Sequence, residues 1–236
     1  MNDDISQIAQ MFRGRFLESP ESLRQKVIRI RAIVFDWDGV FNGGIKDESG
    51  SSTFSEIDAM GTNLLRFSHF IATNQSLFTA IISGEKNPLA FKFAKREHFH
   101  EVYFKIRHKS EAVLHFCRRN EIDPQEVAFV FDDVLDFSAA RICGLRVMVG
   151  RTVNPFLTGY ATQKGLADYI TSVDGGSHAV REAVELMMAI RGNIMDTIEK
   201  RTEFGETYQR YWQFRNAIDP AFYTTEDYIN FQLTPQ

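Results

Sequence analysis

Two aspartates separated by one residue follow the first apolar run of the sequence. The stretch "IRAIVFDWDGV" places Asp36 and Asp38 directly after isoleucine, alanine, valine and phenylalanine, and Gly39 follows at once. Carboxylates this close together repel each other and raise each other's pKa. A hard divalent cation such as Mg²⁺, which prefers oxygen ligands, removes this repulsion. The spacing therefore indicates metal binding or acid–base chemistry rather than a plain core strand.

A second set of polar residues stands where later apolar runs end or the next helix begins. Its members are Ser83, Gly84, Lys109, Asp132, Asp133 and Asp136. Taken singly, each has an ordinary explanation as a helix cap, a turn residue or a solvated charge. Taken together with the first acid pair, they offer carboxylates for Mg²⁺ and a hydroxyl and an ammonium for phosphate. This combination is what phosphoryl transfer requires.

The elements that must position these residues alternate between short apolar strands and amphipathic helices. Strands are predicted over residues 31–36, 77–83, 101–104, 127–131, 145–150 and 168–172. Helices are predicted over residues 3–13, 21–29, 61–74, 87–98, 109–120, 136–144 and 177–201. This alternation predicts an α/β fold, a Rossmann-like parallel sheet flanked by helices on both faces. Because the carboxyl ends of parallel strands share one edge, we expect the polar residues to gather there.

Three segments stand apart from this alternation. Residues 41–57 contain the glycine-bearing stretch "DESGS" and predict a small β-hairpin flap on a core spanning residues 30–195. Residues 1–29 predict an N-terminal helical extension, and residues 196–236 a helical and aromatic C-terminal extension. The tail either packs on the core or reaches a neighbouring subunit and shapes its specificity.

Composition narrows the class of protein. With 236 residues and 44% hydrophobic content, the chain is long enough for one sizeable core. A net charge of −4 argues against a nucleic-acid partner, and no apolar run approaches the about 20 residues of a membrane span. The start of the sequence does not resemble a signal peptide. Cys117 and Cys143 stand in apolar surroundings and are interpreted as core residues, which suits a reducing cytoplasm.

The ordered motifs resemble those of the haloacid dehalogenase superfamily of phosphohydrolases. The stretches that carry the resemblance are "DWDG" at 36–39, "IISG" at 81–84, Lys109, and "DDVLD" at 132–136. The segments "DGVFNGGIKDESGSSTFSEIDAMGTNLL" and "ADYITSVDGGSHAVREAVELMM" are similar to those of 3-deoxy-D-manno-octulosonate 8-phosphate phosphatases and acylneuraminate phosphatases. Those relatives lack a large cap domain and form tetramers in which the hairpin helps to close a neighbour's active site. The resemblance therefore implies a capless homotetramer.

The resemblance also implies a mechanism. Asp36 is expected to attack phosphorus and form an aspartyl phosphate, while Asp38 protonates the leaving alcohol and then activates water. Ser83, Gly84 and Lys109 are expected to bind the phosphate. Asp36, the Asp38 backbone carbonyl and Asp132 are expected to bind Mg²⁺. Asp133 and Asp136 are expected to hold the water molecules on the metal or to orient Lys109. The implied activity is a Mg²⁺-dependent phosphomonoesterase acting on a small phosphorylated metabolite, with sugar and sugar-acid phosphates among the candidates.

Three residues depart from the pattern of these relatives. Phe131 precedes Asp132 where glycine is usual, Asn42 stands where threonine is common, and Glu85 follows "SG" where arginine is common. Because Glu85 is an acid where the relatives have a base, it argues against the anionic sugar-acid substrate of those relatives. The positions that carry the chemistry are kept, so we expect phosphatase chemistry with altered specificity.

Other interpretations compete with this one. The departures and the aromatic tail fit a weakly active or non-catalytic oligomerisation module, although such a scaffold need not keep Asp38. A dehalogenase attacks carbon without a metal and typically lacks the second acid, so Asp38 argues against that activity too. His98, His100 and His108 lie close together in the sequence but lack the spacing of a zinc site, which favours solvated or capping roles.

Overall fold

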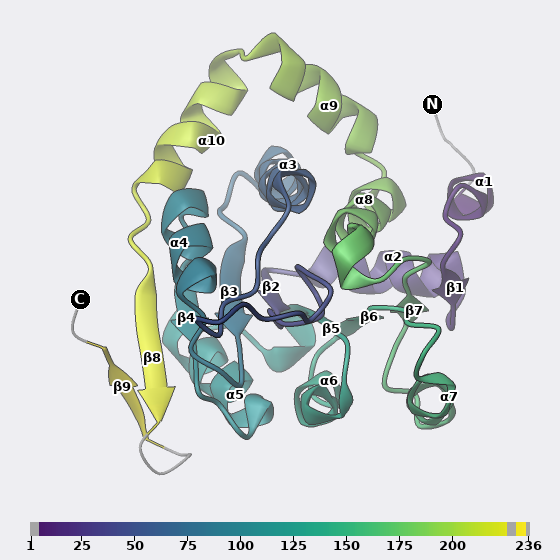
Figure 1. Cartoon of the computed structure of the whole chain (residues 1–236). Coiled ribbons are helices and arrows are strands. Elements are labelled where there is room, and N and C mark those ends of the chain that lie inside the picture. The colour runs from purple at the N-terminus through teal and green to yellow at the C-terminus, as the bar shows by residue number, and fades with distance from the viewer. Residues whose placement is uncertain (1–4, 226–229, 235–236) are drawn as a thin grey trace.

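A single mixed sheet organises the chain. The computed structural model describes residues 5–225 and 230–234, and within them the strand order is β1–β7–β6–β5–β2–β3–β4–β8–β9 (Figure 1). The strands are β1 (Arg15–Phe16), β2 (Ala32–Phe35), β3 (Phe78–Ile82), β4 (Glu101–Tyr103), β5 (Val127–Phe131), β6 (Leu145–Met148), β7 (Tyr169–Ile170), β8 (Ala221–Thr225) and β9 (Phe231–Leu233). The strands from β7 to β8 run parallel, and only β1 and β9 pair antiparallel at the two edges of this described sheet. The predicted α/β class with a parallel sheet is confirmed.

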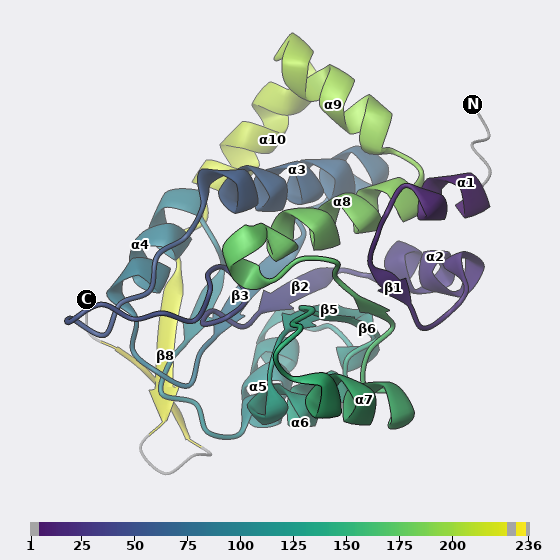
Figure 2. The same cartoon turned by 45° about the vertical axis from the view of Figure 1, so that its right-hand side comes forward.

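Helices cover both faces of the sheet, and Figures 1 and 2 show the two layers. One face packs against α2 (Pro20–Arg29), α3 (Glu56–Thr73), α4 (Pro88–Glu97) and α8 (Ala179–Arg191), and the other against α5 (Lys109–Asn120), α6 (Phe137–Ala140) and α7 (Pro155–Gln163). The remaining helices are α1 (Ile5–Gln10), α9 (Ile194–Glu203) and α10 (Glu206–Asn216). Because both faces are covered, the central strand β2 is fully buried and apolar throughout. The start of the helix predicted at 3–13 lies outside the described residues.

Residues 41–55 form a loop, so the predicted β-hairpin flap is wrong. All of these residues are described and none of them is in a strand. The loop turns at Asp47, whose backbone N–H donates to the carbonyl of Ser51 at 2.8 Å. The Asp47 carboxylate accepts from the backbone N–H groups of Ser49 and Ser51, both at 2.9 Å. An aspartate that binds its own following backbone favours a compact turn over a strand ladder.

The helix predicted over 177–201 is two helices, α8 and α9. Gly192 ends α8 in the left-handed region, with φ 93°, and its N–H donates to the carbonyls of Met188 and Ala189. Asn193 then bonds across to α3, since its Nδ2 donates to the Ser68 carbonyl at 2.9 Å and its Oδ1 accepts from the Ser68 hydroxyl at 2.8 Å. This break turns α9 over α3, as Figure 2 shows.

The described part of the tail packs on the core, as the first of its two interpretations expects. Tyr208 and Tyr211 of α10 are buried against Phe67 and Phe70 of α3. After α10, strand β8 pairs in parallel with β4 and widens the sheet. The sequence predicted neither the bounds of β8 nor the separate helix α7. In the described residues, no helix is long and apolar enough to cross a lipid bilayer.

Candidate active site

The polar residues that follow successive strands meet in one pocket at the carboxyl edge of the sheet. The pocket is a cavity of about 590 Å³. The predicted site residues that line it are Asp36, Asp38, Gly84, Lys109, Asp132, Asp133 and Asp136. Ser83 is buried next to Gly84, and its Oγ accepts from the backbone N–H of Glu85 at 3.2 Å. The polar residues at the strand ends therefore gather at one edge of the sheet, as expected.

In the stretch "DWD", the middle side chain packs in the core while the two aspartates on either side of it line the pocket. The Trp37 side chain is fully buried and packs against Phe41 and Phe93 in the core. Asp36 and Asp38 both line the pocket. The one-residue gap therefore anchors the segment in the core while it presents two carboxylates to one cavity.

Lys109, the first residue of α5, forms two ion pairs at the bottom of the pocket. Its Nζ lies 2.7 Å from Asp36 Oδ1 and 2.5 Å from Asp136 Oδ1. Burial disfavours the ammonium, but the Asp36 and Asp136 carboxylates outweigh that cost and raise the pKa of Lys109. Lys109 is therefore a fixed positive charge beside Asp36.

The nearby cations do not fully compensate the charges of Asp36 and Asp132. Burial raises the pKa of Asp36 well above its usual value, with Lys109 opposing this shift and Asp136 and Asp132 adding to it. Burial and the neighbouring Asp136 raise the pKa of Asp132 to about 6, although Arg151 and Lys109 oppose the rise. Negative charge is thus crowded beyond what the nearby cations neutralise, and a bound cation relieves such crowding.

The acid cluster fits a Mg²⁺ ion. Asp36, Asp132 and Asp136 each offer an oxygen, and these oxygens lie within 4.8 Å of one another. Oδ1 of Asp132 is buried and accepts no hydrogen bond. Asp136 is already engaged, because its Oδ1 pairs with Lys109 and its Oδ2 accepts from the backbone N–H groups of Asp132 and Asp133. An all-oxygen set with an unpartnered carboxylate oxygen is the chemistry that Mg²⁺ takes.

Gly39 allows the loop to pass close to this cluster. Its φ is +86°, and a Cβ atom there would lie 2.3 Å from Asp132 Oδ2 and 2.0 Å from Nη2 of Arg151. Asn42 holds the same turn, since its Oδ1 accepts from the N–H groups of Gly39 and Gly44 and its Nδ2 donates to the Trp37 carbonyl. The glycine and the departure at position 42 therefore both have a structural reason.

The structure adds four polar residues that the sequence reasoning missed, and one of them is Arg107, which lines the pocket. Arg151 Nη2 lies 2.6 Å from Asp132 Oδ2, and Lys46 Nζ lies 3.1 Å from Asp38 Oδ2. The Ser52 hydroxyl donates to Asp38 Oδ1. Arg151 follows strand β6, so the rule of strand ends could have found it. Lys46 and Ser52 come from the irregular loop, which carries no comparable signal.

The other departures have different surroundings. Phe131 is buried and stacks on Phe129 with ring centroids 5.3 Å apart, so it belongs to the core rather than to the pocket. Glu85 lines the pocket and is exposed. Within the described residues, the one group with the spacing of a metal site is the aspartate cluster. His98 holds the C-cap position of α4 and His108 the N-cap position of α5, although the His108 side chain makes no capping hydrogen bond. The expected solvated or capping role is wrong for His100, because its Nδ1 accepts from the backbone N–H of Thr79 at 3.1 Å and burial lowers its pKa. Cys117 and Cys143 are free and buried.

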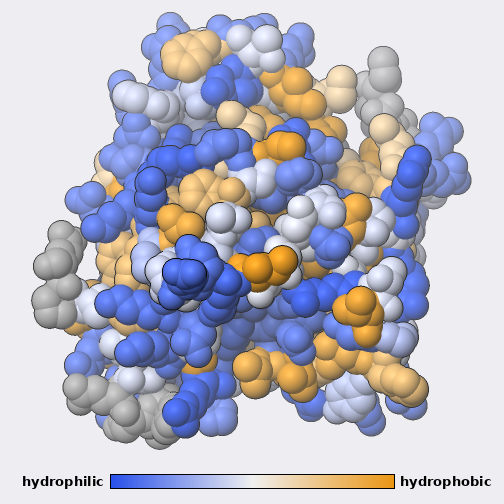
Figure 3. All heavy atoms as spheres, in the orientation of Figure 1, coloured by the Kyte–Doolittle hydropathy of each residue, from blue (hydrophilic) through white to orange (hydrophobic). Residues whose placement is uncertain are grey.

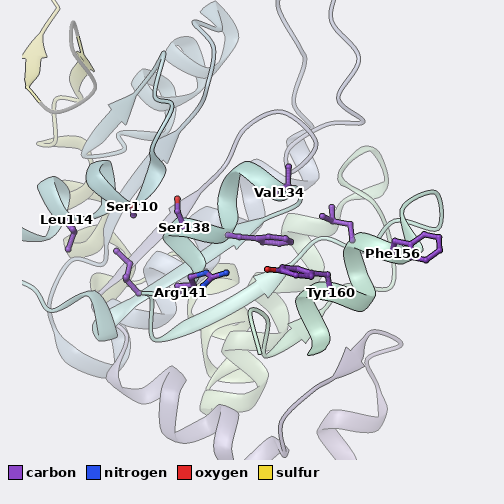
Figure 4. A pocket seen from close by; sticks show the side chains of 10 residues that line it. Ser110, Leu114, Val134, Ser138, Arg141, Phe156 and Tyr160 are labelled. Carbon is purple, nitrogen blue, oxygen red and sulfur yellow. The ribbon is translucent and has the colours of Figure 1, made fainter. Parts of the chain in front are cut away.

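A larger and mostly apolar cavity of about 860 Å³ lies between α5, α6 and α7. Figure 4 shows the ring of Tyr160 and the exposed side chains of Val134 and Phe156 along it. Figure 3 shows hydrophobic surface at the lower right, where Figure 1 places α6 and α7. The residues lining this cavity include no carboxylate and no histidine. The two cavities share no lining residue, and the predicted carboxylates line only the smaller one.

Known phosphatases are similar to this chain in sequence and in fold. The 3-deoxy-D-manno-octulosonate 8-phosphate phosphatase of Escherichia coli (strain K12) is 27% identical over 173 residues, which cover 72% of this chain and 85% of the relative. A structure from Pseudomonas syringae described as a probable YrbI family phosphatase matches with a TM-score of 0.65 and 27% identity, over 77% of this chain and 98% of the other. No family model matches the chain.

A third comparison concerns the fold. The 3-deoxy-D-manno-octulosonate 8-phosphate phosphatase of Moraxella catarrhalis, solved in complex with a magnesium ion, a phosphate ion and a KDO molecule, has a TM-score of 0.63 and 24% identity. The match covers 76% of this chain and 98% of that protein. The resemblance stated from the motifs is therefore confirmed at the level of sequence relatives and of overall fold.

Proposed function

We propose that this chain, a phosphatase of the haloacid dehalogenase superfamily, is a Mg²⁺-dependent phosphomonoesterase that hydrolyses a small phosphorylated metabolite through an aspartyl phosphate. One observation carries the proposal: Asp36 is held 2.7 Å from the buried ammonium of Lys109, in the same pocket as Asp38 and as the unpartnered oxygen of Asp132. The sequence relatives with named substrates support a sugar or sugar-acid phosphate.

The first step forms the covalent intermediate. A carboxylate oxygen of Asp36 attacks phosphorus while the bond from phosphorus to the leaving oxygen breaks, and that oxygen takes the electron pair and a proton from Asp38. Lys109 stabilises the charge that develops on the phosphoryl oxygens, and Ser83 and the Gly84 backbone are proposed to bind the same oxygens. Asp36 is then an aspartyl phosphate and Asp38 a carboxylate.

The second step restores the enzyme. Asp38 removes a proton from water as the water oxygen attacks phosphorus, and the electrons of the bond between phosphorus and Asp36 return to the carboxylate. Inorganic phosphate leaves, and Asp38 again carries the proton it needs for the next cycle. One side chain can serve as acid and then as base because it faces the same pocket in both steps.

The residues proposed to hold Mg²⁺ are Asp36, the backbone carbonyl of Asp38, and Asp132. When bound, the ion supplies positive charge to the phosphoryl oxygens and neutralises the crowded carboxylates. Asp133 and Asp136 support the site, since Asp136 orients Lys109 and accepts from the backbone of Asp132. The fold neighbour from Moraxella catarrhalis was solved with a magnesium ion, which supports the choice of metal.

Substrate and assembly form the finer part of the proposal. Exposed Glu85 at the pocket wall disfavours a second anionic group there, so we expect a neutral sugar phosphate to be preferred over a sugar-acid phosphate. The chain is proposed to act in the cytoplasm as a homotetramer, by analogy with the capless relatives. Light scattering on the purified protein tests the tetramer, and a screen of phosphorylated sugars and sugar acids tests the substrate class.

Phosphate release tests the chemistry. Purified protein with Mg²⁺ is expected to release phosphate from p-nitrophenyl phosphate, and Asp36→Asn is expected to abolish the release. Asp196→Asn is the matched control, because this residue pairs with Lys200 on the surface of α9, and it should keep full activity. Equal activity in Asp36→Asn, or no turnover of any ester by a correctly folded tetramer, contradicts the proposal and favours an oligomerisation module.

A further inference from the structure

Ser52 connects the candidate acid–base residue to the protein core. It lies in the loop 41–55, its side chain is buried, and its hydroxyl group contacts three polar neighbours. Trp37 Nε1 lies 3.2 Å and Asn87 Nδ2 2.7 Å from Ser52 Oγ. The third neighbour is Asp38 Oδ1, which accepts the Ser52 hydroxyl.

The direction of each of these hydrogen bonds is fixed by chemistry. The indole N–H of Trp37 can only donate. Asn87 is the N-cap of α4, and its Oδ1 accepts from the backbone N–H groups of Leu89 at 3.0 Å and Ala90 at 3.4 Å. The amide group of Asn87 therefore has to turn its Nδ2 toward Ser52, where it can only donate.

Ser52 consequently has one place left for its own proton. A hydroxyl group accepts two hydrogen bonds and donates one. Trp37 and Asn87 occupy both accepting positions, so the proton points to Asp38 Oδ1. This oxygen then has to accept, and a proton carried by Asp38 has to sit on the other oxygen, Oδ2. Oδ2 is the oxygen that faces Lys46, another residue lining the pocket.

We infer that Ser52 is a positioning residue that assigns the two oxygens of Asp38 their separate tasks. Oδ1 is anchored by the hydroxyl, and Oδ2 delivers the proton to the leaving oxygen as the phosphorus–oxygen bond breaks and later takes a proton from water. The inference rests on the proposed function, because it presupposes that Asp38 acts as the acid and base. It adds a hydrogen-bonded path from the start of α4 to the reacting proton.

The leaving group offers a direct test. p-Nitrophenolate departs without a proton, whereas the more basic phenolate of phenyl phosphate needs one, and the two esters have nearly the same shape. The ratio kcat/KM covers the steps up to phosphoryl transfer and leaves out hydrolysis of the intermediate. Ser52→Ala is expected to lower kcat/KM for phenyl phosphate about 10-fold to 100-fold. This loss is smaller than the whole contribution of acid catalysis, because Asp38 itself is still present. For p-nitrophenyl phosphate we expect a change below about 3-fold, since no acid catalysis is lost.

Two variants control for a structural effect. Ser52→Thr keeps the hydroxyl and should restore the wild-type ratio between the two substrates. Ser51→Ala removes a neighbouring buried hydroxyl, which lies 3.0 Å from the Ser49 hydroxyl rather than binding Asp38, and should leave the ratio unchanged. If circular dichroism shows that Ser52→Ala does not fold, Ser52→Cys takes its place, because the thiol has similar shape and is a weaker donor.

The outcomes separate this inference from the proposed function. Equal losses for both esters in Ser52→Ala, or a Ser52→Thr variant that behaves like the alanine variant, overturn the positioning role while phosphatase activity stands. A wild-type protein that releases phosphate from neither ester overturns the proposed function, and the role of Ser52 falls with it.

Discussion

The ammonium nitrogen of Lys109 lies 2.7 Å from Oδ1 of Asp36, and both side chains are buried. The same oxygen also accepts from the backbone N–H of Trp37 at 2.7 Å. Two donors on one oxygen fix the plane of the carboxylate and leave its other oxygen for attack or for a metal ion. The pair therefore orients the candidate nucleophile and also offsets its charge.

Removing the ammonium should destabilise the protein, most strongly without metal. Lys109→Met keeps the length of the side chain but leaves the Asp36 and Asp136 carboxylates buried without a cation. We expect a loss of about 3–5 kcal/mol in the free energy of unfolding, as for other broken buried pairs, and loss of phosphatase activity. Saturating Mg²⁺ should recover part of the stability, since it neutralises the same carboxylates. Urea unfolding in EDTA and in Mg²⁺ measures both effects.

The control for this experiment is Lys46→Met in the loop. Its ion pair with Asp38 is more exposed to solvent, with 34% of the Lys46 side chain accessible, and should be worth less than about 1 kcal/mol. A Lys109→Met protein as stable as wild type in EDTA contradicts the assigned role of the buried pair.

Gly39→Ala should damage the site more than the fold. The new methyl group would meet Asp132 Oδ2 at 2.3 Å and Arg151 Nη2 at 2.0 Å, in a backbone conformation with φ +86° that favours glycine. We expect a loss of stability of about 1–2 kcal/mol from the strained backbone and at least a 100-fold loss of activity from the displaced Asp132. Gly43→Ala is the control, because a Cβ atom there meets nothing within 4 Å. Wild-type kinetics in Gly39→Ala argue that Asp132 does not take part.

The sheet and the ends of its strands could be predicted because their signal is local. β2 and β5 are continuous apolar runs, and β3 is interrupted only by Thr79. Their parallel pairing aligns Ala32 with both Phe78 and Val127. The polar residues that follow each run are thereby brought to one edge. The rest depends on long-range contacts. Lys46 and Ser52 reach the pocket through the shape of a loop, and the aromatic tail gave no periodicity from which β8 could be recognised.

Tyr211 shows what the tail contributes. Its ring packs 5.2 Å from that of Phe67, and its hydroxyl donates to the backbone carbonyl of Asn63 at 3.2 Å. Tyr211→Ala should cost about 3–5 kcal/mol as a buried aromatic deletion, and Tyr211→Phe about 1 kcal/mol for the lost hydrogen bond. The neighbouring Trp212 is 48% exposed, so Trp212→Ala should change stability by only about 0.5 kcal/mol. Thermal unfolding of the three variants tests this order, and equal costs for Tyr211→Ala and Trp212→Ala contradict it.

His100 should make the fold sensitive to acid. Burial, with a smaller effect of Arg66, lowers the pKa of His100 to about 3, and its Nδ1 lies 3.1 Å from the backbone N–H of Thr79, which donates to it. The unfolded chain takes up a proton near pH 6.5 while the folded chain does not, so stability is full above this pH and falls as the pH drops toward 3. The loss should reach about 1 kcal/mol between pH 7 and 5.5.

His100→Asn isolates this contribution from those of other histidines. Burial also lowers the pKa of His69 to about 3 and that of His115 to about 4, so the wild-type stability falls with acid for several reasons. The asparagine keeps an oxygen that can accept from Thr79 but does not titrate. Urea unfolding at pH 7 and 5.5 should therefore show a pH dependence smaller by about 1 kcal/mol in the variant than in the wild type. Identical pH dependences in the two proteins would mean that His100 is protonated in the folded state, against the geometry of its bond with Thr79.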